Sequence, residues 1–570
     1  MLPIFIITTI LGTPPSNGDK IICNTSLESK RKINPVDLGH ILLPPNFLVI
    51  PEGESAIIKL KLENTSSLQR EFLLSIYLGK ELHKEERISL PSGGKREISE
   101  EMVLPKGEHI VKMRVKEGEE IIEEKEWKVI VEKPASYTTF GATYCDLRYD
   151  MPVLFYKDGQ FERKSWDEVW RNGPYADVLV RFPNGARLAF WRGTSYIPIW
   201  AQEKSGFSYE WVEVIAPRGP EYVDCIEPLM DKECRYSRVA IIHNTPARVL
   251  IHWRYAESDF NYLIFENEWV DEYYYLYPDG IGVRTVLAWL APKVKHEMNE
   301  LITILPPAVH PNDVLPSNAV DFLDLEGNKQ AITWPQPKLN WPYGKPSIIR
   351  VKLKEDFHPI MVVPAISEFT AVWDGWKDEK GNYISPCYWG NHWPVTRNLQ
   401  TVAHPPIGWE EGPAHASLIS MIHTPIKEED VTPSTHKTIW SHLIGTLMAT
   451  EDDSRLLLIA TSWLKPGKLE SRSKNIQIKG YDILQRAYVI QCLDKSESIT
   501  LRLEPEDKIL NPAFLFLDFD GELSSLSVDG ESLTSENYRW GIEEENGRKN
   551  LILWLERLID KPVEIVLKTR

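Results

Sequence analysis

The sequence is poor in the features that mark several protein classes. Only 6 of its 570 residues are cysteine, and they are widely spaced, so a scaffold built on disulfides is excluded. After the first few residues, no run reaches the roughly 18 uninterrupted apolar residues that a membrane-spanning helix needs. Basic residues number 65 against 82 acidic ones, and the resulting net charge of -17 argues against nucleic-acid and anionic-membrane partners.

Several catalytic motifs are also missing. There is no HExxH zinc motif, no GxSxG nucleophile elbow, no Cys/His signature and no glycine-rich loop of the Walker or Rossmann type. Zinc hydrolysis, serine or cysteine nucleophilic catalysis and nucleotide binding are therefore unsupported, and we expect no metal centre.

The one cofactor that the sequence leaves open is Ca²⁺, which a polar loop could bind. Cys225 and Cys234 are close enough in sequence to indicate a local disulfide bridge. Between them lie three carboxylates that could serve as oxygen ligands for Ca²⁺, although a solvated loop is the more common structure. These are Glu227, Asp231 and Glu233.

The regular pattern that is present has a period of two. Short alternating runs recur with turn residues such as PNG, PDG and DG between them, whereas helical periodicity is nearly absent. We therefore expect an all-β chain of two to four domains. The expected parts are an immunoglobulin-like sandwich at 34–133, a large antiparallel domain at 137–505 and a small C-terminal β region at 506–570.

The first residues differ from the rest of the chain. Residues 1–20 contain an apolar run about as long as the hydrophobic part of a signal peptide, but without a basic start or an A-x-A cleavage site. We expect a signal segment here and a secreted or cell-surface protein. The sequence does not predict the oligomeric state.

Aromatic and titratable residues concentrate in one stretch, at 385–415. Six of the fourteen histidines lie between His392 and His442, and the stretch itself mixes them with tryptophan, proline and glycine. Histidine titrates near neutral pH, and flat aromatic rings stack on sugar rings, so a sugar-binding site is the favoured interpretation over a plain surface loop. The expected substrate-binding residues here are Trp389, Trp393, His404, Trp409, Glu410 and His415.

Two strands in the middle of the chain add further candidates. In VLIHWRYA the period of two places His252 and Arg254 on one face, with Trp253 and Tyr255 on the other. Rows of this kind either line a binding face or form core. We include His252 and Arg254 among the substrate-binding candidates.

The segment 247–307 resembles the galactose-mutarotase-like super-β-sandwich. A strand of alternating aromatics leads through a PDG turn into a strand with an arginine, and then into one that ends in Leu-Pro. The segments WRGTSY and GNHWPV are similar to stretches of polysaccharide-degrading proteins. The resemblance implies a super-β-sandwich that holds sugars on its concave face, with a β-propeller as the alternative fold.

These observations favour a polysaccharide lyase that cleaves a uronic-acid polysaccharide by β-elimination. Elimination needs a base, an acid and a clamp for the uronate carboxylate. The residues with suitable side chains are His392 as the base, Tyr196 or Tyr388 as the acid, and Arg397 or Arg192 with Asn391 as the clamp. A glycoside hydrolase and a non-catalytic glycan-binding surface protein remain the alternatives, and the histidine cluster favours an enzyme over binding alone.

Overall fold

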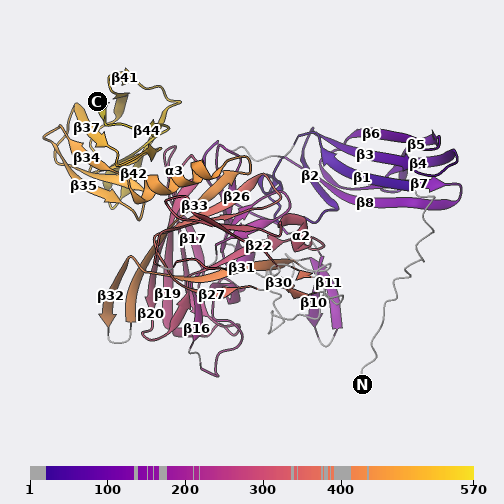
Figure 1. Cartoon of the computed structure of the whole chain (residues 1–570), viewed down its shortest axis with the longest axis horizontal. Helices are drawn as coiled ribbons and strands as arrows, with labels where there is room; N and C mark the ends of the chain where they lie inside the picture. The colour runs from indigo at the N-terminus through magenta and orange to yellow at the C-terminus, as the bar shows by residue number, and fades with distance from the viewer. Residues whose placement is uncertain are drawn as a thin grey trace. The chain divides into compact units, whose positions relative to one another are not determined.

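The structure is a computed structural model of the chain. The residues it describes are 21–31, 33–133, 139–149, 152–157, 160–165, 176–209, 211–216, 219–334, 339–342, 344–373, 376–377, 383–384, 387–390, 413–432 and 435–570. Contacts divide the chain into two compact units, Met1–Leu38 with Pro45–Ser136, and Gly39–Pro44 with Tyr137–Arg570. Figure 1 shows both units, and each is described here by itself.

The first unit is a two-sheet sandwich. A three-stranded sheet has the order β1-β3-β6, and a five-stranded sheet has the order β2-β8-β7-β4-β5, in which only the β2–β8 pair is parallel. Alternation forms its core, because Ile58, Leu60 and Leu62 of β3 are buried while Lys61 between them is exposed. The elements are β1 (Ile21–Ser29), η1 (Pro35–Leu38), β2 (Phe47–Pro51), β3 (Ser55–Asn64), β4 (Arg70–Leu78), β5 (Glu81–Leu90), β6 (Lys95–Val103), β7 (Gly107–Glu117) and β8 (Glu120–Glu132).

The second unit contains two large antiparallel sheets. The nine-stranded sheet has the order β27-β31-β22-β15-β14-β13-β12-β9, with β30 paired to β31. Its strands are β9 (Gly141–Cys145), β12 (Asp177–Arg181), β13 (Arg187–Phe190), β14 (Pro198–Ala201), β15 (Gly206–Ser208), β22 (Asn299–Leu305), β27 (Ile366–Val372), β30 (Cys387–Gly390) and β31 (Ala414–His423).

The ten-stranded sheet has the order β17-β18-β19-β20-β33-β26-β25-β23-β24, with β32 paired to β33. Its long central strands β19, β20 and β33 carry labels in Figure 1. Its strands are β17 (Arg238–Asn244), β18 (Val249–Ser258), β19 (Ile264–Leu276), β20 (Ile281–Leu290), β23 (Val320–Leu323), β24 (Lys329–Ile332), β25 (Ser347–Val351), β26 (Phe357–Val363), β32 (Lys427–Thr432) and β33 (Thr435–Met448).

The two large sheets pack face to face. Phe190 of the nine-stranded sheet meets Tyr274 of the ten-stranded sheet edge-on, with ring centroids 5.1 Å apart. The Tyr209 hydroxyl donates to the carbonyl oxygen of Gly445 at 2.9 Å. The prediction of an all-β fold is thus confirmed, and the strands form sheets of nine and ten rather than the four-stranded blades of the alternative propeller.

A second sandwich ends the chain, drawn in orange and yellow in Figure 1. Its sheets have the orders β34-β37-β45-β40-β41 and β35-β36-β39-β43-β42, and they enclose their own apolar core. This sandwich begins before the expected boundary at residue 506. Its strands are β34 (Lys468–Ser471), β35 (Ile476–Asp482), β36 (Ala487–Cys492), β37 (Ser498–Glu504), β39 (Ala513–Leu517), β40 (Leu523–Val528), β41 (Glu531–Ser532), β42 (Tyr538–Glu545), β43 (Arg548–Leu555) and β45 (Val563–Thr569).

Buried ion pairs join the terminal sandwich to the ten-stranded sheet. Arg248 forms two hydrogen bonds to Glu543, at 2.9 and 2.5 Å, and both side chains are buried. Arg486 binds Asp279 at 2.8 Å in the same way. Because a buried charge without its partner is costly, these pairs fix the terminal sandwich on the sheet.

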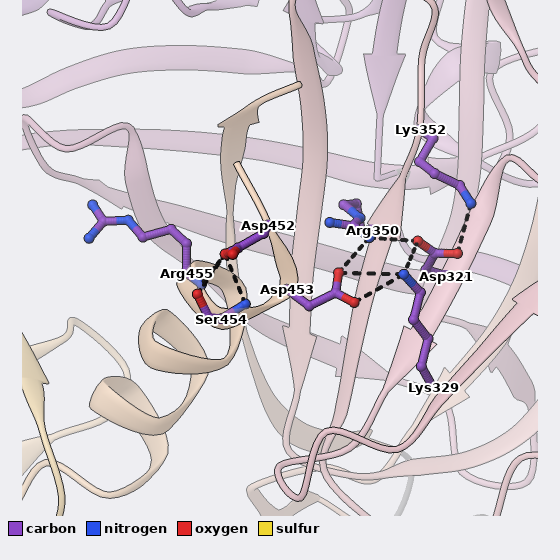
Figure 2. Close-up of polar contacts among 8 residues, drawn as sticks. All are labelled: Asp321, Lys329, Arg350, Lys352, Asp452, Asp453, Ser454 and Arg455. Carbon is purple, nitrogen blue, oxygen red and sulfur yellow. Dashed lines mark hydrogen bonds and ion pairs between the residues drawn. The ribbon is translucent and has the colours of Figure 1, made fainter. Parts of the chain in front are cut away.

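Helix α3 (Asp453–Leu464) connects the main sheets to the terminal sandwich, and its first residues are tied to the sheet by charge (Figure 2). Asp452 caps it by accepting from the Ser454 amide at 3.1 Å. Asp453 binds Arg350 at 2.6 Å and Lys329 at 3.1 Å. The leucines and Trp463 on its inner side join the apolar core beneath.

The remaining described elements are short. They are β10 (Pro152–Lys157), β11 (Gln160–Ser165), η2 (Arg192–Thr194), β16 (Glu213–Ala216), η3 (Pro228–Met230), β21 (Lys295–Glu297), α2 (Pro311–Val314), β28 (Trp376–Lys377), β29 (Tyr383–Ile384), β38 (Ile509–Leu510) and β44 (Leu558–Ile559). In the part of the chain that the structure describes, no helix is long and apolar enough to cross a membrane.

Candidate functional site

Many of the predicted site residues lie outside the described residues, because they fall within 391–412. These are Asn391, His392, Trp393, Arg397, His404, Trp409 and Glu410. Their convergence with Arg192 and Tyr196 on one site stays a prediction.

The start of the same stretch is described as strand β30. It pairs antiparallel with β31, where Trp389 stands opposite His415 and Tyr388 stands opposite Ala416. The backbone register therefore brings the beginning of the histidine-rich stretch to β31, which pairs with β22 and β27 in the nine-stranded sheet.

Arg192 and Tyr196 lie at the turn η2 and just after it. The Arg192 guanidinium is paired with Asp146 and, at 3.3 Å, with Asp177, and only 17% of its side chain is exposed. Tyr196 is 1% exposed and has a positive φ of 67°. Burial raises the pKa of Tyr196, which keeps its phenol protonated.

His252 and Arg254 share one face of β18, as the alternation predicts. Both bind Asp271 of β19, His252 at 2.7 Å and Arg254 at 2.8 Å. Trp253 and Tyr255 point to the opposite face and are fully buried. His252 and Arg254 thus lie on the face of the sheet that turns away from the nine-stranded sheet.

Cys225 and Cys234 do not form the local bridge that their spacing indicates. The three carboxylates considered as calcium ligands do not form a metal site among the described residues either. Asp231 instead accepts backbone N–H groups from Arg235, Tyr236 and Ser237, which fold the loop around its carboxylate. Among the described residues there is no group of three or more His, Cys, Asp or Glu side chains that could hold a metal ion.

The sequence did not single out the most unusual chemistry of the described structure. Five glutamates from separate strands and one loop of the second unit act on one another electrostatically, and we call them the carboxyl cluster. They are Glu213, Glu227, Glu257, Glu297 and Glu300.

Strand pairing positions the outer members of the carboxyl cluster. Glu213 of β16 stands directly opposite Glu297 of β21, and Glu300 of β22 stands opposite Ser420 of β31. Residues opposite each other in an antiparallel pair share a face. Glu213 is partly exposed, whereas Glu297 and a carboxyl oxygen of Glu300 are buried, so the cluster reaches solvent at Glu213.

Glu297 and Glu300 have acid groups suited to proton transfer at neutral pH. Burial raises the pKa of Glu297 to about 8, and the charge of Glu300 adds to the rise. Burial also raises the pKa of Glu300 to about 8, against the lowering effect of the Ser417 hydroxyl. Both groups therefore hold a proton at pH 7 that an ordinary glutamate would have lost.

The deeper members, Glu227 and Glu257, are more perturbed. Glu257 is fully buried, and neither of its carboxyl oxygens has a hydrogen-bond partner within the described ranges. Burial, together with the charges of Glu268 and Glu213, raises its pKa well above the usual range. Burial and the charge of Glu213 do the same to Glu227. Such groups are neutral acids in the folded protein.

A histidine adjoins the cluster on β31. The His415 imidazole Nε2 lies 3.1 Å from the Ser417 hydroxyl, and that hydroxyl in turn acts on Glu300. His415, a predicted substrate-binding residue, is therefore connected to the carboxyl cluster through Ser417. It is 3% exposed, so it acts from beneath the site and not at its surface.

Nearby carboxylates inside the sandwich are paired, which sets the cluster apart. Glu272 binds Arg284 through two hydrogen bonds, at 2.7 and 2.5 Å, and also accepts from the Tyr255 and Tyr274 hydroxyls. Glu268 contacts His296 at 2.9 Å. These carboxylates are satisfied structural groups, whereas burial raises the pKa values of Glu227, Glu257, Glu297 and Glu300 in the cluster.

A sequence signal for the cluster existed in the strands themselves. Glu213 and Glu300 stand within WVEVIA and NELITIL, where nearly every neighbour is apolar. An acidic residue inside a buried strand is costly unless it has a role, and such positions are candidates for function. The arrangement can donate a proton from one carboxyl group and accept one at another, which is general acid–base chemistry.

Comparison with known proteins gives no assignment. No family model matches the chain, and no curated protein matches it in sequence. The CARDB domain of the PF1109 protein from Pyrococcus furiosus matches in structure with 11% identity and a TM-score of 0.15, covering 20% of this chain and 90% of that chain. A beta-glucosidase from Listeria innocua in complex with glucose matches with 16% identity and a TM-score of 0.15, covering 20% of this chain and 16% of that chain. These likenesses are too limited to bear on function.

Proposed function

We propose that this protein is a carbohydrate-active enzyme that cleaves a polysaccharide, and that Glu300 and Glu297 supply its general acid. The observation that carries the proposal is that burial raises the pKa values of both groups to about 8 beside a partly exposed carboxylate, Glu213. Cleavage of a glycosidic bond needs an acid to protonate the leaving oxygen, and raised carboxyl pKa values serve that purpose.

Hydrolysis is the reaction that these groups support best. Glu300 donates its proton to the glycosidic oxygen as the bond from that oxygen to the anomeric carbon breaks. Water adds to the anomeric carbon, and Glu213, whose charge acts on Glu300, accepts the proton that the water loses. The products are two shorter sugar chains, one of which has a new reducing end.

β-Elimination is the second candidate, with His392 as the base. The pairing of β30 with β31, which brings the chain that precedes Asn391 beside His415, favours it. Two of its expected groups are constrained in the structure. Arg192 is already held by Asp146 and Asp177, and Tyr196 is buried.

One assay tests the proposal and separates the two reactions. The purified chain is incubated with a panel of neutral and uronic-acid polysaccharides, while reducing ends and the ultraviolet absorbance of unsaturated uronates are read in parallel. New reducing ends without absorbance are expected. Reducing ends with absorbance would indicate elimination instead, and the absence of both from every polysaccharide would overturn the enzyme proposal.

A variant then tests the role of Glu300. Glu300→Gln keeps the shape of the side chain but removes its transferable proton, so kcat should fall at least about a hundredfold. Glu326→Gln, at an exposed turn of the same unit, is the matched control and should keep full activity. An active Glu300→Gln enzyme would contradict the assignment of the acid.

A further inference from the structure

A second surface of the same unit has the chemistry of a polysaccharide platform. Trp269 of β19 and Trp289 of β20 stand directly opposite each other, and both are partly exposed. The alternate residues Val270 and Tyr274 are buried between the two large sheets. The two indole rings therefore lie on the outer face of the ten-stranded sheet, and we call them the tryptophan platform.

Cations flank both rings of the tryptophan platform. The Arg254 guanidinium lies 4.8 Å from the Trp269 ring centroid, and the Lys437 ammonium lies 5.8 Å from that of Trp289. Lys437 also stands opposite Trp289 in the strand register. Each ring thus has a cation over it, and that cation can pair with the carboxylate of a sugar unit that contacts the ring.

The neighbouring side chains hold this arrangement in place. Asp271 accepts two hydrogen bonds from Arg254, at 3.0 and 2.8 Å, which fixes the guanidinium beside Trp269. His252, on the other side of Asp271, stacks on Tyr273 with centroids 4.7 Å apart and rings inclined by 13°. A preorganised surface loses less entropy when a ligand binds.

The charge of this face is opposite to that of the whole chain. In strands β17 to β20, β32 and β33, the register places four cations on the same face as the platform, against two carboxylates, in a chain of net charge -17. The cations are Arg238, Arg254, Lys427 and Lys437, and the carboxylates are Asp271 and Glu429. A local positive excess attracts an anionic polymer and not a neutral one.

We propose that the tryptophan platform binds an acidic polysaccharide, with sugar rings stacked on Trp269 and Trp289 and carboxylates placed beside Arg254 and Lys437. This proposal rests on the proposed function, because it names the class of polymer that the enzyme acts on. The platform lies on the outer face of the ten-stranded sheet, whereas the carboxyl cluster is built around β16, β21 and β22. It acts as a holding surface for the polymer.

Equilibrium binding tests the platform without reference to turnover. Polygalacturonate and neutral dextran are titrated against the full chain and against Glu300→Gln, which should not degrade the polymer. Polygalacturonate should bind and dextran should not. Trp269→Ala and Trp289→Ala should each weaken binding at least about tenfold, since each removes an aromatic ring on which a sugar unit would stack.

Two further variants keep the result interpretable. Lys437→Gln leaves the aromatic surface unchanged and should weaken polygalacturonate binding with a shallower dependence on salt, because one screened charge is removed. Tyr77→Ala is the matched control, since it removes a similar ring beside Arg114 in the first unit. It should bind like the original chain.

Three outcomes would overturn the platform. They are equal binding of dextran and polygalacturonate, unchanged binding in both tryptophan variants, and a concentration-dependent dimer in sedimentation that Trp289→Ala dissociates. The last would make the platform a contact between two copies of this chain. Binding without any cleavage would instead refute the proposed function and leave the platform intact. Cleavage with normal kinetics in both tryptophan variants would refute the platform and leave the proposed function intact.

Discussion

Two groups of buried carboxylates in the second unit have opposite surroundings. Asp321 is surrounded by Lys352, Arg350 and Lys329, at 2.8, 2.7 and 3.1 Å (Figure 2). Burial alone would raise its pKa, but hydrogen bonds from Lys352 and Arg350 outweigh it and hold the pKa below the usual range. Burial instead raises the pKa values of Glu297 and Glu300 to about 8, and neighbouring carboxyl groups add to the rise.

The difference separates groups that stabilise the fold from groups suited to chemistry. A carboxylate with cationic partners is ionised and supports the structure at neutral pH. A carboxyl group among its own kind must stay protonated, and it makes the folded state less stable as the pH rises. Proteins keep such costly groups mainly at functional sites, which is why the carboxyl cluster, and not the Asp321 network, is the candidate site.

The largest loss of stability should come from replacing Glu272, a carboxylate that is fully buried with its partner Arg284. Glu272→Gln leaves the Arg284 guanidinium, which is 1% exposed, without its anion. The free energy of unfolding should fall by about 3–5 kcal/mol, the usual cost of an uncompensated buried charge. Urea unfolding followed by fluorescence measures it, with Glu326→Gln as the exposed control. A loss below about 1 kcal/mol would show that the pairing of Glu272 with Arg284 contributes little to the free energy of unfolding.

The dependence of stability on pH should separate the two groups of carboxylates. Because the folded pKa values of Glu297 and Glu300 are raised, the folded state binds more protons than the unfolded state between about pH 4.5 and 8. Their contribution to stability therefore falls as the pH rises through that window, by at most about 1.4 kcal/mol per pH unit for each group. Unfolding midpoints of Glu300→Gln should fall less steeply than those of the original chain.

Asp321 should show the opposite sign. Its folded pKa is lowered, so its contribution is present above the unfolded value near 3.8 and is lost as the pH falls through the folded value. Asp321→Asn should cost about 2 kcal/mol at pH 7, from charge-assisted hydrogen bonds, and less below pH 4. Equal costs at both pH values would mean that the charge of Asp321 is irrelevant and only its packing counts.

The smallest effect is expected at the edge of the Asp321 network. Asp452 caps helix α3 through the Ser454 and Arg455 amides, at 3.1 and 3.3 Å (Figure 2). Asp452→Ala should cost about 1 kcal/mol, whereas Asp452→Asn, which can still accept those bonds, should cost less. Thermal unfolding compares the two, and equal losses would show that the negative charge and not the cap is what counts.

The sequence by itself determined the fold class and the faces of the strands. Alternation has a physical cause, since successive side chains in a strand point to opposite sides, and it correctly separated His252 and Arg254 from Trp253 and Tyr255. It placed the last boundary at residue 506, which falls between strands that share one core. The domain to which a short polar strand belongs is decided by the strands with which it pairs.

Only the tertiary structure decided which polar residues meet. Glu213, Glu257 and Glu300 are far apart along the chain, and their pKa values and partners depend on strands that pair across long intervals of sequence. The tertiary structure also placed Arg192 against two aspartates, buried Tyr196 and left Cys225 and Cys234 without a disulfide between them. Composition and spacing specify which side chains are available, but burial and neighbouring charge, which exist only in the folded chain, set their chemistry.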